Sequence, residues 1–91
     1  RAGTENLVAA AGMAAVAGAA LRELAEGAWE RVAELRNILE GALEAACPDT
    51  IFVGRRSPRL PNTTLALTPG WKGETQVMAM DLAGFAVSSG S

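Results

Sequence analysis

Pro48 divides the chain into two parts of different character. The sequence before it contains no other proline, and apolar residues recur there at three- and four-residue steps, which is the spacing of a helix face. Proline cannot continue a helix, because its ring is bulky and it has no backbone N–H to donate. We therefore predict one long helical unit over about residues 5–46 and a separate, smaller architecture over residues 47–91.

The helical unit changes composition near its middle, where Gly27 is a candidate bend. Its first half is rich in alanine and carries an apolar stripe of Leu7, Ala10, Ala11, Ala14, Ala17 and Leu21. Its second half is amphipathic, with an apolar stripe of Leu24, Ala28, Val32, Leu35, Leu39 and Leu43. The opposite face is charged, and we interpret it as solvated; it comprises Glu23, Glu26, Glu30, Glu34, Arg36, Glu40 and Glu44.

The alanine-rich half has few charges on any face, so we expect other protein structure to cover it. The run 7–21 is too short and too weakly hydrophobic for a membrane span, and it lacks the basic leader of a signal peptide. We therefore expect no contact with a membrane and a cytoplasmic location. A net charge of −2 and a pI near 5 argue against direct binding to nucleic acid.

Residues 47–91 carry the signals of strands and turns. Ile51–Val53 and Thr63–Leu67 are short apolar or β-branched runs that predict strands, and the second ends at a Pro-Gly turn. Residues 73–83 have helical spacing and are followed by a glycine suited to a C-terminal cap. Phe85–Val87 predicts a third strand that leads into a flexible polar loop.

Together these elements predict one α+β domain. It comprises a long bent helical unit over residues 1–46 and, over residues 47–91, a small antiparallel or mixed sheet of about three strands with one inserted helix. A chain of 91 residues is long enough for one domain with a modest core.

The chain offers few reactive side chains. It has no histidine, one lysine and one cysteine, so we predict no catalytic residue and no metal site within it. Cys47 follows a predicted helix end, whose dipole disfavours a thiolate, and we interpret it as a small structural residue. Lys72 lies in a turn exposed to water, which does not suit Schiff-base chemistry. The loop containing Arg55, Arg56 and Arg59 is able to bind an anion, although a merely soluble loop is the favoured interpretation.

The start of the first helix is a second candidate anion site. Thr4 or Gly3 is predicted to be its N-cap, with Glu5 in the first turn, where a negative charge complements the helix dipole. A hydroxyl beside free backbone N–H groups at a helix N-terminus suits a phosphate. Most threonine N-caps do no more than cap their helix.

Several segments resemble the cysteine desulfurases, which are pyridoxal-phosphate enzymes of the class V aminotransferase group. The stretches LPNTTLAL, MAMDLAG and AVSSGS are similar to the C-terminal region of that family, and Arg1–Asn6 is similar to its R-x-G-T-E-N segment. In the family, SSGS is followed by Ala-Cys, and that cysteine accepts the sulfur. The lysine that carries the cofactor lies before the segment that Arg1 begins. The chain is therefore expected to be a piece of a longer enzyme and inactive alone.

This resemblance implies a fold, a set of site residues and partners. The fold is the small C-terminal domain of a fold-type I pyridoxal-phosphate enzyme. Thr4 matches a residue that binds the cofactor phosphate of the other subunit in a homodimer, with Arg1 and Asn6 as structural supports. Ser88, Ser89, Gly90 and Ser91 match the loop that carries the nucleophile.

The implied partners are L-cysteine, a second subunit and a sulfur-acceptor protein, in the synthesis of iron–sulfur clusters or thio-cofactors. A selenocysteine lyase or another class V aminotransferase is the alternative enzyme. Composition alone is equally compatible with a non-catalytic packing or dimerisation module.

Overall fold

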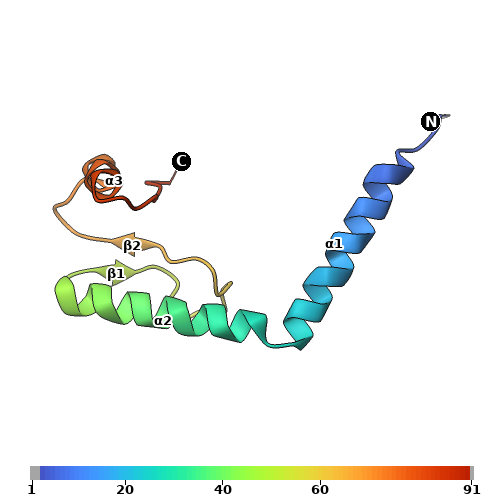
Figure 1. Ribbon diagram of the computed structural model, residues 1–91. Coiled ribbons are helices and arrows are strands. Elements are labelled where there is room, and N and C mark those ends of the chain that lie inside the picture. The colour runs from blue at the N-terminus through green and yellow to red at the C-terminus, as the bar shows by residue number, and fades with distance from the viewer. Residues whose placement is uncertain (1–2, 91) are drawn as a thin grey trace.

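The computed structural model describes residues 3–90 as an elongated α+β structure measuring 56 × 30 × 26 Å (Figure 1). Its elements in chain order are α1 (Leu7–Ala25), α2 (Ala28–Ala46), β1 (Ile51–Phe52), β2 (Ala66–Leu67) and α3 (Gly73–Leu82). Helix α2 ends two residues before Pro48, as predicted, and α3 agrees with the predicted helix to within one residue.

Gly27 separates the two long helices. Its φ of 81° lies in the left-handed region, which glycine adopts without the steric cost that a side chain would bring. The amide of Gly27 donates to the carbonyl of Leu24 at 3.3 Å, which closes the last turn of α1. The predicted bend is therefore confirmed, and Figure 1 shows α1 leading away from α2 and from the rest of the molecule.

The two strands form an antiparallel ribbon beside α2. Ile51 lies opposite Leu67 and Phe52 opposite Ala66, and the amide of Val53 donates to the carbonyl of Leu65 at 2.9 Å. Because side chains alternate along a strand, Phe52 lies on the opposite face from Ile51. At 8% exposure, Phe52 is the one buried apolar side chain among the residues that the structure describes, so the core is very small.

Phe85–Val87 does not form the predicted third strand, and the sheet within residues 3–90 has two strands. The chain turns sharply at Gly84, whose φ is 87°. There the amide of Phe85 donates to the carbonyl of Met80 at 2.9 Å and closes the end of α3. That donor is consequently not available for strand pairing. The predicted strands 51–53 and 63–67 also shorten, to two residues each.

Helix α1 has no buried residue. Its large apolar side chains are 56–85% exposed, and they comprise Leu7, Val8, Met13, Val16, Leu21 and Leu24. The helix continues four residues beyond Leu21, and with 19 residues it is long and apolar enough to cross a membrane by length and composition alone. The expectation that this run is too short for a span is therefore wrong on length. Core helices of soluble proteins and signal sequences meet the same criterion.

Candidate functional site

Glu40 of α2 is the most deeply buried side chain of the described chain, at 2% exposure. Arg59 donates to its two carboxylate oxygens at 2.7 and 2.9 Å, and the hydroxyl of Thr64 donates at 2.8 Å. These hydrogen bonds, that of Arg59 above all, lower the pKa of Glu40 to about 2, although burial alone would raise it. The cluster ties the segment between β1 and β2 to α2.

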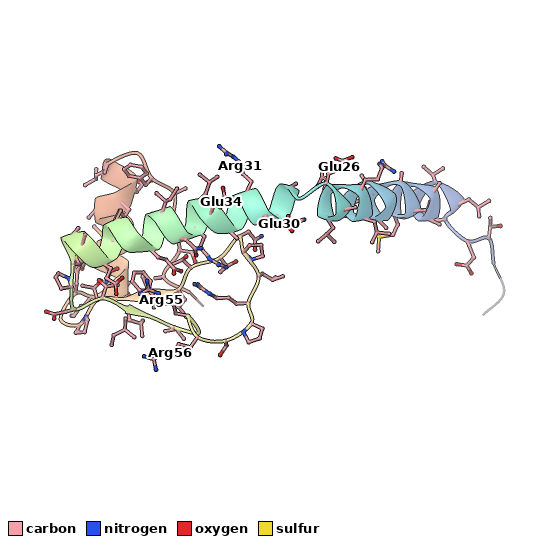
Figure 2. The ribbon with its side chains drawn as sticks, turned by 90° about the horizontal axis from the view of Figure 1, so that it is seen from below. Glu26, Glu30, Arg31, Glu34, Arg55 and Arg56 are labelled. Atoms are coloured by element: carbon pink, nitrogen blue, oxygen red, sulfur yellow. The ribbon has the colours of Figure 1, made fainter. Side chains whose placement is uncertain are left out.

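Arg55 connects the carboxylate of Glu44 to this cluster. Its guanidinium donates to Glu44 at 3.0 and 3.1 Å, lies 3.8 Å from Glu40, and covers the ring of Phe52 at 5.1 Å. The hydrogen bond from Arg55 lowers the pKa of Glu44 below its usual value. Figure 2 shows Arg55 beside α2 and Arg56 directed away from it. We call Glu40, Glu44, Arg55, Arg59 and Thr64 the carboxylate cluster.

The carboxylate cluster corrects two predictions from the sequence. Glu40 does not belong to a solvated face, and Arg55 and Arg59 do not lie in a merely soluble loop. The sequence signal was the spacing: two glutamates lie one helical turn apart, and two arginines lie four residues apart in the following loop. Because its carboxylates and guanidinium groups pair with one another, the cluster stabilises the fold and has no reactive group to offer.

An open groove of about 500 Å³ lies between the ribbon and α3. Its walls are largely apolar and include Ile51, Leu65, Leu67, Val77, Met80 and Val87. Ser88 and Ser89 also line the groove, so two residues of the predicted nucleophile loop border an apolar surface.

The segment 88–90 is exposed and lies in no helix or strand. The amide of Gly90 donates to the hydroxyl of Ser88 at 3.3 Å, and Gly90 has a left-handed φ of 84°. Ser89 lies against Gly73 at the start of α3, where an added Cβ would lie 3.4 Å from the Cβ of Ser89. Ser91, the fourth residue of the predicted nucleophile loop, lies outside the described residues.

Asn6 is the N-cap of α1. Its side-chain oxygen accepts a hydrogen bond from the amide of Ala9 at 2.9 Å. The prediction that Thr4 or Gly3 caps the helix is therefore wrong, and Glu5 precedes the cap instead of lying in the first turn. The N-cap is Asn6 and not Thr4 because the helix begins later than predicted. The carboxamide of Asn6 reaches the amide three residues further along the chain.

Thr4 is exposed and lies two residues before this cap. The amides of Leu7 and Val8 have no acceptor within the helix, and donors of this kind, like a threonine hydroxyl, suit a phosphate group. These donors match the phosphate group of a cofactor and no other part of it. Figure 1 shows the start of α1 far from α3 and the C-terminal segment, so one chain does not bring Thr4 and residues 88–90 together.

Cys47 and Lys72 are both exposed. Cys47 follows the end of α2, and its amide donates to the carbonyl of Leu43 at 2.8 Å. Its side chain is exposed, so it is not part of the small core of the described residues. Lys72 precedes α3 in an exposed turn, as predicted. Within residues 3–90, no three acidic, cysteine or histidine side chains lie close enough to hold a metal ion.

The whole chain is similar to curated proteins. It is 35% identical over 91 residues to a cysteine desulfurase of Enterobacter agglomerans and 38% identical to one of Cereibacter sphaeroides. It is also 35% identical to the cysteine desulfurase NifS of Azotobacter vinelandii. No protein-family model matches the chain, and no solved structure matches it.

The chain is similar to cysteine desulfurases over its whole length. This finding confirms the resemblance that was carried by the terminal motifs. The chain spans 22% of the length of each of these cysteine desulfurases, while all of its own residues are covered. The similarity therefore includes the ribbon, the groove and α3 as well as the two terminal motifs.

Proposed function

We propose that the chain is part of a cysteine desulfurase, which takes sulfur from L-cysteine and leaves alanine and a persulfide on a protein cysteine. The observation that carries this proposal is the similarity of the entire chain to proteins named cysteine desulfurase. The exposed segment 88–90 supports it, because a segment that carries a nucleophile to a partner must be accessible and free to move. The sulfur passes to an acceptor protein for iron–sulfur clusters or thio-cofactors in the cytoplasm.

The cofactor of this proposal is pyridoxal 5′-phosphate, which acts as an electron sink when it is bound. In this chain Thr4, with the amides at the start of α1, would hold the phosphate. Figure 1 shows the start of α1 well apart from the C-terminal segment, and this favours a role for Thr4 in the site of a second subunit. The homodimer is thus part of the proposal.

The exposure of α1 supports an assembly larger than this chain. A helix with large apolar residues 56–85% exposed loses stability in water unless other protein covers it. We propose that a second subunit or further protein structure covers α1. The same exposure also favours the runner-up function, a non-catalytic packing or dimerisation module.

Product analysis of the complete protein tests the proposed function. With pyridoxal phosphate and L-cysteine it should release alanine, whereas the 91-residue chain alone should release none above the rate of the free cofactor. L-selenocysteine as a competing substrate distinguishes a selenocysteine lyase. A dimeric protein that forms no alanine from either substrate would favour the packing module. If the isolated chain converted L-cysteine to alanine and Cys47→Ala abolished this reaction, our interpretation that Cys47 is not a nucleophile would be contradicted.

A further inference from the structure

Ser89 lies beside Gly73, so an exposed C-terminal segment meets the start of α3. Gly73 is the first residue of α3, whereas Ser89 lies in the exposed segment 88–90. A Cβ added at Gly73 would lie 3.4 Å from the Cβ of Ser89, which is the near limit of ordinary van der Waals contact. The missing side chain at Gly73 therefore leaves a space that the side chain of Ser89 borders.

Two further observations place the segment at this point. Val87 and Ser88 line the apolar groove together with Val77 and Met80 of α3, so the residues just before Ser89 follow the surface of the same helix. Beyond Ser89, the amide of Gly90 bonds back to the hydroxyl of Ser88 in a tight turn. The path of Val87 and Ser88 along the groove thus brings Ser89 beside the start of α3, and the turn at Gly90 follows it.

We propose that Gly73 is a positioning residue for the segment 88–90. Because Gly73 has no side chain, Ser89 is able to lie against the start of α3. We call this contact between Gly73 and Ser89 the seat, and it determines where the segment leaves the groove. The role of the seat in sulfur transfer rests on the proposed function, whereas the seat itself does not. Because the segment is exposed and lies in no helix or strand, its movement away from the seat should cost little free energy.

Hydrogen exchange at the amide of Gly90 in the complete protein measures occupancy of the seat. Gly73→Val, whose branched side chain reaches beyond the Cβ position, should raise that exchange rate about fivefold, which corresponds to the loss of about 1 kcal/mol of contacts. Gly73→Ala should leave the rate unchanged, since its Cβ only makes contact. Gly41→Val is the matched control, because an added Cβ in this exposed part of α2 meets nothing within 4 Å.

A double-mutant cycle separates the seat from a general weakening of α3. In a Ser89→Gly background the colliding Cβ is gone, so Gly73→Val should cause no further increase in exchange. Should Gly73→Val fail to fold, Gly73→Thr, whose side chain is also branched at Cβ, replaces it and should also raise the rate. An equal effect of the Gly73 substitution in both backgrounds, or no effect of either Gly73→Val or Gly73→Thr, would overturn the seat.

Alanine formation then tests the role of the seat in the reaction. Gly73→Val should lower kcat and leave the KM for L-cysteine unchanged, and Gly73→Ala should retain the original kcat. Faster exchange with an unchanged kcat would overturn the positioning role. If the complete protein forms no alanine at all, the proposed function fails, while the exchange measurement still decides whether the seat exists.

Discussion

The guanidinium of Arg59 donates two hydrogen bonds, of 2.7 and 2.9 Å, to the buried carboxylate of Glu40, which lies 19 residues earlier in the chain. A carboxylate that is 2% exposed is retained in a fold only where paired donors replace its water. With a single buried apolar side chain among the described residues, the structure depends on this pair to hold the segment between the strands against α2.

Removal of Arg59 should therefore destabilise this region. In Arg59→Ala, the carboxylate of Glu40 loses its principal donor, and a buried, poorly compensated charge costs about 2–3 kcal/mol. Arg59→Lys should recover only part of this loss, because an ammonium cannot make the same bidentate contact. Urea unfolding followed by circular dichroism measures the change. Arg56→Ala, at an arginine directed away from α2, is the control, and an equal loss there would show that the pairing is unimportant.

The stability of this region should decrease as the pH is lowered through the acid range. The pKa of Glu40 is lowered from 4.5 to about 2 by the fold, so its contribution is present above pH 4.5 and is lost as the pH falls toward 2. We expect a loss of about 1–2 kcal/mol over that window, less than the full shift because water lies close to so small a core. Urea midpoints at pH 6, 4 and 3 measure it. The pH dependence should be shallower in Glu40→Gln, and an identical slope would assign the effect to other groups.

The cap of α1 should depend on Asn6 and not on Thr4. Asn6→Ala removes the acceptor for the amide of Ala9 and should weaken the first turn by about 1 kcal/mol. Amide exchange at Ala9 in the complete protein should accelerate by about fivefold. Thr4→Ala is the matched control and should leave that amide unchanged. Faster exchange in the Thr4 variant alone would restore Thr4 as the cap.

Thr4→Val tests the proposed contact with the cofactor phosphate. A hydrogen bond to a charged group contributes about 1.5–3 kcal/mol, so cofactor retention should weaken by one to two orders of magnitude. The protein should still dimerise, because valine has nearly the shape of threonine. Dialysis followed by absorbance of the bound cofactor measures retention, and unchanged retention would remove Thr4 from the site.

A heterodimer shows which subunit Thr4 serves. One subunit carries Thr4→Val and the other lacks the lysine that binds the cofactor, so the single intact lysine site lies in the Val-bearing subunit. If the contact crosses the interface, the partner supplies a normal Thr4 and retention should be close to that of the unmodified protein. Retention as weak as in the Thr4→Val homodimer would place the contact within one subunit.

The amino-acid sequence by itself determined the breaks and most of the helices. Pro48, Gly27 and Gly84 act through their own backbone chemistry, so their effects are local and can be recognised without a fold. The periodicity of residues 73–83 likewise predicted α3. The terminal motifs indicated the cysteine desulfurases, because a family resemblance is a property of the sequence alone.

Only the tertiary structure decided which distant groups meet. The pairing of Glu40 with Arg59 and Thr64 joins residues 19 and 24 positions apart, and its formation depends on how the intervening chain closes over α2. The seat of Ser89 on Gly73 has the same origin. Phe85–Val87 has the composition of a strand, but strand pairing requires a free donor and a neighbouring edge. The carbonyl of Met80 takes the donor of Phe85 at the turn that ends α3.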